Sequence, residues 1–259
     1  MIPLVDPHVH LLAGMDDGPR TLDDAVAMCR LAAADGVRAM AATAHQNDRW
    51  NEVTPEGIRA ATATLREALV RERIPVDVFP NAEVTARLET PQDWDAGRLL
   101  SFADRGRYLL VEMPRGVYVD LLPMVGELRE RGVRVILAHP EKEPELLHGA
   151  GLLDALIDAG CLVQVSASSI TDPKDREDFT ALQSWFKRGM VHLLASDGHS
   201  PRRRPPLMAA AHREIGGWIG SVAADRIASG NGMALLRGQR IRVRRPMARE
   251  ARGWFSRWW

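Results

Sequence analysis

Seven short runs of apolar residues recur along this chain, separated by segments in which apolar residues follow a helical spacing. The runs cover residues 2–5, 37–43, 76–84, 108–113, 133–138, 161–165 and 191–195. Between them, apolar residues recur every three or four positions over 22–32, 58–69, 121–128, 152–159 and 179–186, which is the period of one helix face. Short buried strands that alternate with helices indicate an α/β fold with a parallel sheet.

Glycines punctuate this pattern where a helix is expected to end and the next strand to begin. Gly36, Gly132 and Gly160 each follow a helical segment and directly precede an apolar run. Glycine tolerates the left-handed backbone that commonly terminates a helix. Because βα units this regular close most easily into a barrel, we expect a TIM-like barrel in one domain, residues 1–238, followed by a separate extension over 239–259.

The composition is compatible with one such barrel. The chain has 259 residues, 46% of them hydrophobic and 26% charged, and barrels of this kind run to roughly 250 residues. No stretch approaches the roughly 20 apolar residues that span a bilayer, and the N-terminus lacks a signal-peptide pattern. Two cysteines, Cys29 and Cys161, provide no disulfide framework, so we expect a cytoplasmic protein.

The net charge of zero conceals an uneven distribution along the chain. Residues 1–236 carry 26 basic and 33 acidic side chains, whereas residues 237–259 carry eight arginines and one acid. An acidic body is compatible with bound cations and does not suggest a nucleic-acid-binding core. The extension also holds Trp254, Phe255, Trp258 and Trp259. We interpret it first as a packing or partner segment. Contact with an anionic membrane surface, or no role, are the alternatives.

Histidines and carboxylates cluster near the C-terminal ends of the predicted strands. In His8-Val9-His10 the two imidazoles lie on one side of a strand, because strand side chains alternate. Imidazole and carboxylate together bind Zn, Mn or Fe, and active sites form at this end of a barrel. His148, His192 and His212 lie within predicted elements and are interpreted as structural. The candidate groups at or beyond the strand ends are His8, His10, the pair Asp16 and Asp17, His45, Glu83, Glu112, His139, Asp197 and His199.

In this order, the motifs resemble the PHP (polymerase and histidinol phosphatase) superfamily. The chain is most similar to its bacterial capsule-type protein-tyrosine phosphatases, on the strength of Met15-Asp16-Asp17-Gly18-Pro19, Glu112 and Arg204-Pro205-Pro206. The similarity runs from about residue 3 to residue 238. The motifs are His-x-His (8–10), Asp-Asp-Gly (16–18), Thr-x-His (43–45), Val-Glu-Met (111–113), Ala-His-Pro-Glu (138–141) and Ala-Ser-Asp-Gly-His (195–199), with the Glu83 strand between them.

The resemblance implies a distorted (β/α)7 barrel with two or three divalent ions, usually manganese and sometimes iron or zinc. It implies that the first ion is held by His8, His10, Glu83 and Asp197. Glu83 would bridge to a second ion bound by Glu112 and His139. The third ion would be held by Asp17, His45 and His199.

The implied activity is hydrolysis of phosphotyrosine by metal-bound hydroxide, on a bacterial tyrosine kinase that regulates capsule or exopolysaccharide synthesis. Divalent ions neutralise phosphoryl oxygens and lower the pKa of bound water. Arg204 matches the family's phosphate-binding arginine, and Asp197 or His199 would help to protonate the leaving phenolate. Lys142 stands where the family often has arginine, so it would bind phosphate as a point charge rather than a fork.

Three other functions stay open at this stage. One is a phosphatase of a small phosphomonoester such as histidinol phosphate, and another is a non-catalytic partner-binding module. A nucleic-acid exonuclease is less favoured, because no basic, aromatic-rich groove is evident. Chemistry through a cysteine nucleophile requires Cys-x5-Arg, and neither Cys29 nor Cys161 is followed by that arginine.

Overall fold

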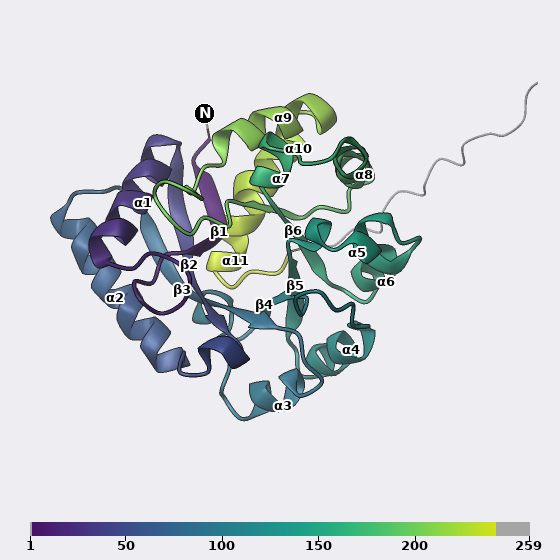
Figure 1. The fold of residues 1–259 in the computed structure, drawn as a ribbon, viewed down its shortest axis with the longest axis horizontal. Coiled ribbons are helices and arrows are strands. Elements are labelled where there is room, and N and C mark those ends of the chain that lie inside the picture. Colours follow the sequence, from purple (N-terminus) through teal and green to yellow (C-terminus); the bar gives the residue numbers. More distant parts are fainter. Residues whose placement is uncertain (1, 242–259) are drawn as a thin grey trace, which may run out of the picture.

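The computed structural model describes residues 2–241, and its centre is one sheet of seven parallel strands in sequence order. The sheet curls into a nearly closed barrel (Figure 1). Between the first and last strands, the Asp197 N–H donates to the His8 carbonyl and the His10 N–H to the Gly198 carbonyl, both at 2.9 Å. The predicted α/β barrel is confirmed. The strands are β1 (Leu4–His10), β2 (Val37–Gln46), β3 (Asp77–Thr85), β4 (Tyr108–Glu112), β5 (Arg134–Ala138), β6 (Leu162–Ser166) and β7 (Leu193–Ala195).

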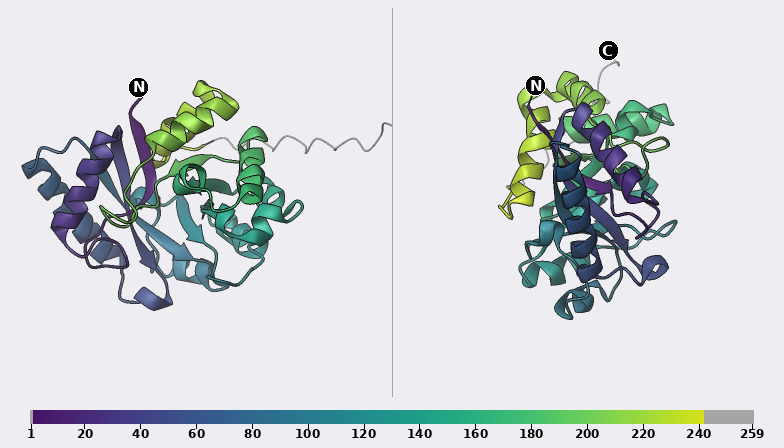
Figure 2. Two further views of the ribbon diagram at one scale, coloured as in Figure 1. Left: turned by 45° about the horizontal axis from the view of Figure 1, so that its top comes forward. Right: turned by 90° about the vertical axis from the view of Figure 1, so that its left-hand side faces the viewer.

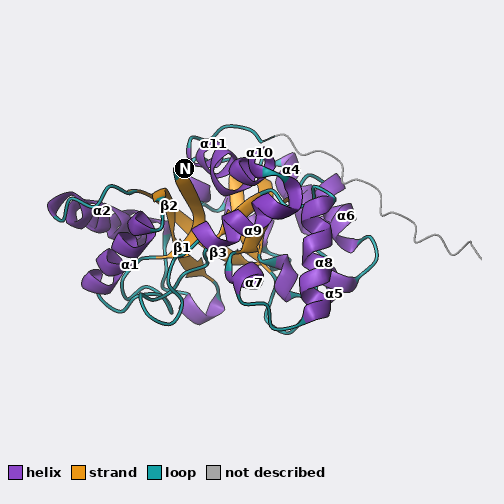
Figure 3. Ribbon diagram, turned by 90° about the horizontal axis from the view of Figure 1, so that it is seen from above, coloured by secondary structure: helices purple, strands orange, loops and turns teal. Residues whose placement is uncertain are grey.

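Helices surround the strands on the outside of the barrel (Figures 2 and 3). All five helices expected from the spacing of apolar residues are present, whereas the short helices and the C-terminal group were not predicted. The helices are α1 (Leu22–Ala34), α2 (Pro55–Arg71), α3 (Thr90–Asp95), α4 (Leu122–Glu130), α5 (Pro144–His148), α6 (Leu152–Asp158), α7 (Ser168–Thr171), α8 (Arg176–Lys187), α9 (Ala209–Ile219), α10 (Ser221–Asp225) and α11 (Asn231–Leu236). Single helical turns are η1 (Asp48–Trp50), η2 (Phe102–Asp104), η3 (Pro140–Lys142) and η4 (Arg226–Gly230).

Local sequence signals set the ends of the main helices. Thr21 and Thr54 cap α1 and α2, each side-chain oxygen accepting a hydrogen bond from a backbone N–H of the first turn. Gly36, Gly132 and Gly160 have φ angles of +99°, +77° and +109°, as expected for glycines that stop a helix. The chain therefore turns into each following strand without the steric cost of a Cβ.

Two apolar cores lie on the two faces of the barrel wall. The outer core fills the space between strands and helices, with Met40, Leu109 and Val163 fully buried. The inner core fills the base of the barrel, where Tyr108 and Leu162 pack with Leu235 of α11. Helix α11 approaches the barrel closely because Gly232 has no side chain. A Cβ there would lie 2.9 Å from a methyl carbon of Val5.

The inward-facing positions change from apolar to polar along the strands. On β2 the column begins with Ala39 and Ala41 in the inner core and ends with the buried Thr43 and His45. The same change occurs on β4, from Leu110 to Glu112, and on β6, from Leu162 to Gln164. Because side chains alternate across a strand, this change separates an apolar base from a polar mouth.

A bulge in β1 brings its histidines into the interior. Asp6 pairs with Met40 and Val9 with Ala42, so three residue steps on β1 match two on β2. The extra residue shifts the alternation by one position. Val5 therefore belongs to the inner core while His8, three residues later, also faces the barrel interior.

Within residues 2–241, no helix combines the length and the apolar character needed to cross a lipid bilayer. The arginine- and tryptophan-rich extension, with its expected packing, partner or membrane contacts, begins at residue 239. From residue 242 onward it lies outside the described residues.

Candidate metal centre

The nine predicted ligands converge at the carboxyl ends of the strands. The described residues contain three groups of side chains whose nitrogen or oxygen atoms lie within 4.8 Å of one another, close enough to share a metal ion. Together the groups include every predicted ligand except His139, which lies 2.9 Å from Glu83. The groups are His10, Asp17, His45 and His199; His8, His10 and Asp197; and His45, Glu83 and Glu112.

Glu83, at the end of β3, is the centre of the cluster. One of its carboxylate oxygens, Oε2, lies 3.2 Å from the Nε2 atoms of both His8 and His10 and 3.3 Å from Nδ1 of His45. The other, Oε1, lies 2.9 Å from Nε2 of His139. Glu83 is 1% exposed. A carboxylate that faces histidines with both of its oxygens could hold a divalent ion on either side.

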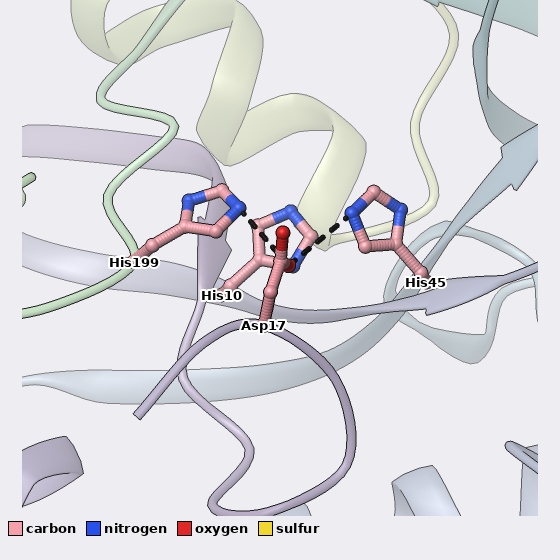
Figure 4. Close-up of side chains that lie close together, drawn as sticks. All are labelled: His10, Asp17, His45 and His199. Carbon is pink, nitrogen blue, oxygen red and sulfur yellow. Dashed lines mark ion pairs between the residues drawn. The ribbon is translucent and has the colours of Figure 1, made fainter. Parts of the chain in front are cut away.

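Asp17, from the loop after β1, joins the histidines of two distant strand ends (Figure 4). Its Oδ1 atom lies 3.5 Å from Nε2 of His45 and 3.5 Å from Nε2 of His199. The rings of His10 and His199 are stacked, with centroids 3.9 Å apart. Residues separated by more than 180 positions in sequence thus form one pocket wall.

Two of the predicted ligands have strained backbones. His139, just after β5, has a φ angle of +35°, and Asp197, just after β7, has +52°. Side chains other than glycine rarely adopt this left-handed region, and such residues concentrate at functional sites. At both positions the strand has ended, so the turn, rather than strand alternation, aims the side chain.

Asp16 orients the imidazole of His10 and anchors the backbone at His45, a role that the sequence did not indicate. Its Oδ2 accepts a hydrogen bond from Nδ1 of His10 at 2.7 Å and from the backbone N–H of His45 at 3.0 Å, while Oδ1 accepts from the Gly18 N–H at 2.9 Å. With Nδ1 engaged, Nε2 of His10 is turned toward Glu83. The Asp-Asp pair in the sequence was the available signal, but it did not distinguish an orienting residue from a ligand.

Two further supports come from inside the barrel. Oε1 of Gln164 on β6 lies 2.9 Å from Nδ1 of His8, which leaves Nε2 of His8 facing the cluster. Asp6 is fully buried and accepts hydrogen bonds from the backbone N–H groups of His8 and Ser196. Burial raises the pKa of Asp6 to about 6. In the sequence, both residues look like ordinary strand positions.

An aromatic stack holds His45 at the rim. The indole of Trp50 lies parallel to the His45 ring, with centroids 4.7 Å apart and an interplanar angle of 4°. The guanidinium of Arg49 lies 4.4 Å from the centroid of the same indole. The indole of Trp50 therefore stacks on a predicted ligand, His45, and also contacts the Arg49 guanidinium. The sequence did not indicate this arrangement.

The electrostatics of the pocket favour added positive charge. Burial alone would lower the pKa of His10 and His45, but neighbouring carboxylates outweigh it and raise these pKa values to about 9 and about 11. Burial opposes ionisation of Glu83, yet the surrounding histidines hold its pKa well below the usual range. Carboxylates that draw protons onto imidazoles in this way would bind divalent cations equally well, so the donor set fits a metal cluster.

The two predicted phosphate-binding residues both contact Asp197. The ammonium of Lys142 lies 2.5 Å, and the guanidinium of Arg204 2.8 Å, from Oδ2 of Asp197. Arg204 also donates to the Asp197 carbonyl at 2.9 Å. Both side chains stay partly open to solvent, with exposed fractions of 39% and 48%. Both cationic groups therefore lie next to a predicted ligand and remain accessible to solvent.

The remaining candidate groups lie away from the cluster. His148 pairs with Asp178 and His212 with Asp225, each at 2.8 Å or less. Cys29 and Cys161 are buried and unpaired, and burial raises the pKa of both thiols to about 12. Neither thiol has the reactive form that nucleophilic catalysis requires.

The fold and the donor cluster define a parallel α/β barrel with a candidate metal centre at its carboxyl mouth. The chain belongs to the family described as "Capsular polysaccharide synthesis, CpsB/CapC", whose model matches residues 4–237. The resemblance drawn from the motifs is thereby confirmed.

Relatives of known name agree with this assignment. The chain is 30% identical to the tyrosine-protein phosphatase YwqE of Bacillus subtilis, over 78% of this chain and 79% of that protein. It is 24% identical to the tyrosine-protein phosphatase CpsB of Streptococcus pneumoniae, over 92% and 100%. A crystal structure reported with YwqE and CpsB, described there as unique metal-dependent tyrosine phosphatases, superposes with a TM-score of 0.88 at 28% identity, covering 96% of this chain and all of that one.

Proposed function

We propose that this protein is a metal-dependent protein-tyrosine phosphatase. The observation that carries the proposal is the convergence of five imidazoles and four carboxylates at one end of the barrel, on a chain that belongs to the CpsB/CapC family. The proposed ligands are the nine predicted from the sequence, and the proposed ions are two or three divalent metals, manganese first, with iron or zinc as alternatives.

When bound, such ions neutralise phosphoryl oxygens and lower the pKa of water. The protein's own residues position the substrate. Arg204 and Lys142 lie beside Asp197 with their cationic groups half-open to the pocket, where they would bind the phosphoryl oxygens of phosphotyrosine. Asp197 or His199 is proposed to assist departure of the phenolate by passing a proton to its oxygen. Burial lowers the pKa of His199 to about 3, and the cations around Asp197 hold its pKa low against burial, so either group would have to receive that proton before passing it on.

We further propose that the substrate is a phosphotyrosine on a bacterial tyrosine kinase that regulates capsule or exopolysaccharide synthesis. The names of the relatives and of the family support this proposal. We assign catalysis to residues 1–238. A cytoplasmic location is proposed as well, supported by the two free, buried cysteines.

The deciding experiment measures metal content by mass spectrometry together with hydrolysis of phosphotyrosine peptides, with and without a chelator. We expect bound divalent metal, chelator-sensitive release of phosphate, and recovery when Mn²⁺ is added back. Histidinol phosphate serves as the comparison substrate, because a small-phosphomonoester phosphatase is the alternative. Equal turnover of both substrates would favour that alternative, and chelator-resistant turnover would contradict the metal centre.

A further inference from the structure

We propose that a groove beside the metal centre binds the peptide segment that flanks the phosphotyrosine, and that it favours acidic residues in that segment. The inference rests on the proposed phosphatase function and names the substrate feature that this site would select. The groove has a volume of about 570 Å³, within the range of specific ligand pockets, roughly 300–1,000 Å³.

Loops after four consecutive strands contribute one basic residue each to the groove. Arg115 follows β4, Lys142 follows β5, Lys174 follows β6 and Arg204 follows β7. Two of them connect the groove to the metal centre, since Lys142 and Arg204 both contact Oδ2 of Asp197. A peptide whose phosphotyrosine reaches the cluster could therefore place the residues on one side of the phosphotyrosine over this groove.

The other two basic groups are available to a ligand. Within residues 2–241, neither Arg115 nor Lys174 has a carboxylate within 4 Å, whereas Lys142 and Arg204 both do. Arg115 and Lys174 are both exposed. Unpaired cations at the edge of a binding site attract an anionic partner and fix its register.

Most acidic residues of the groove are already engaged. Glu141 is buried and accepts hydrogen bonds from the Ser166 N–H and the Ser169 hydroxyl. Asp175 caps α8, and Asp178 contacts His148 at 2.7 Å. Of the four acids that line the groove, this leaves Asp172 against the two unpaired cations. The lining is formally neutral, with four basic and four acidic residues, but three of the four acids already have partners within the protein, whereas Arg115 and Lys174 have no carboxylate of the described residues within 4 Å.

The floor of the groove is apolar and held in place by packing. Leu147 of α5 and Leu182 of α8 are buried beneath it, and Phe179 of α8 packs edge-on against Trp218 with ring centroids 5.5 Å apart. Helices α5 and α8 lie side by side in Figures 1 and 3. A firm apolar floor with basic edges suits an extended peptide that has one apolar and several acidic side chains.

The test uses full-length protein loaded with Mn²⁺ and phosphotyrosine peptides that are identical except for acidic, neutral or basic flanking residues. Two variants, Arg115→Glu and Lys174→Glu, reverse the unpaired charges. We expect each to raise KM for the acidic peptide about 3- to 10-fold, with kcat unchanged and with a lower KM for the basic peptide. Turnover of p-nitrophenyl phosphate, which has no flanking residues, should not change.

The matched control is Arg213→Glu, an exposed charge reversal on α9 in a separate hollow near Gly36 and Arg38. It should leave all three peptides unaffected. Equal KM values for acidic and basic peptides in the wild type, or an equal response of p-nitrophenyl phosphate to the groove variants, would overturn the inference.

A binding measurement separates this inference from the phosphatase proposal. Fluorescence anisotropy with an acidic peptide that carries a non-hydrolysable phosphonate analogue of phosphotyrosine reports on the groove without turnover. Charge-selective binding without turnover of any phosphotyrosine would contradict the proposed activity and would still support the proposed peptide groove. Turnover without charge-selective binding would contradict only the inference about the groove.

Discussion

The inward-facing side chains at the two ends of the barrel serve opposite purposes. At the base, Tyr108 and Leu162 pack with Leu235 of α11 in a closed apolar core. At the mouth, the inward-facing positions carry histidines, carboxylates and Gln164, and two of the predicted ligands, His139 and Asp197, have left-handed backbones. Burying apolar groups stabilises the fold, whereas burying ionisable groups costs free energy unless they are paired or bind ions. The base therefore stabilises the scaffold on which the mouth is held.

This division predicts that mouth substitutions change catalysis and base substitutions change stability. The largest effect belongs to Glu83, because its two oxygens face histidines from different strands. For Glu83→Gln we expect metal content to fall and phosphotyrosine turnover to drop more than about 1,000-fold, with an unchanged circular dichroism spectrum. The control is Glu145→Gln, the same change at an exposed position on α5. If Glu83→Gln kept wild-type turnover, the assignment of Glu83 as a metal ligand would be wrong.

At the base, Leu162→Ala should lower stability and leave catalysis unchanged. Leu162 is 0% exposed and belongs to the inner core, so truncation leaves a cavity and lowers the free energy of unfolding by about 2–5 kcal/mol. Urea unfolding measures this loss. The kcat of the remaining folded enzyme should not change. Leu152→Ala, at a partly exposed position on α6, is the control and should cost far less. A large fall in kcat would show that base and mouth are not separable.

The pH dependence of stability provides a third test, through His192 just before β7. Its Nδ1 accepts a hydrogen bond from the Val163 N–H, and burial lowers its pKa from 6.5 to about 4. Folded protein keeps this ring neutral while unfolded chains protonate it. Its contribution is therefore complete above pH 6.5 and is lost as the pH falls toward 4. Each pKa unit is worth about 1.4 kcal/mol.

The variant His192→Asn keeps an acceptor but cannot titrate. Between pH 7 and pH 4.5, wild type should lose about 2–3 kcal/mol more unfolding free energy than this variant, both measured in urea with a chelator present. The candidate ligand histidines are the same in both proteins, so their contribution cancels in the difference. Parallel stability curves would show that His192 is not held neutral.

The smallest expected effect concerns Asp16, which touches the cluster only through other residues. The carboxylate of Asp16 accepts hydrogen bonds from three N–H groups. In Asp16→Asn the amide NH2 would replace one of the accepting oxygens and lose part of these bonds, so we expect metal affinity to weaken about 10- to 100-fold. Titration of metal-free protein with Mn²⁺ measures the change, and the exposed Asp23→Asn on α1 is the control. Unchanged affinity would make Asp16 a purely structural residue.

Much of the fold and the candidate ligand set could be predicted from the amino-acid sequence. The seven strands and the five periodic helices follow from apolar spacing, which is a local property of the chain. Eight of the nine candidate ligands follow from their place at or after the strand ends, since parallel strands end at one edge, whereas the choice of Asp17 over its neighbour Asp16 follows from the family resemblance. Which ion each would hold stays a prediction.

The orienting residues could not be predicted in the same way. Gln164 lies in an apolar strand, and nothing near it in sequence shows that it contacts His8, 156 positions away. Trp50 resembles any helix-terminal aromatic until its ring is found parallel to His45. Lys142 and Arg204 were expected to face phosphate, and only the structure shows that both also contact Asp197.

The sequence by itself determined the order of elements, the closure-prone βα pattern and the chemical types at each strand end, because these depend on neighbours within a few residues. The tertiary structure alone decided which way each of those groups points. The bulge in β1 reverses the alternation before His8, and the left-handed turns at His139 and Asp197 aim side chains after their strands have ended. Such choices depend on hydrogen bonds and packing between segments far apart in the chain, and local sequence patterns do not encode those contacts.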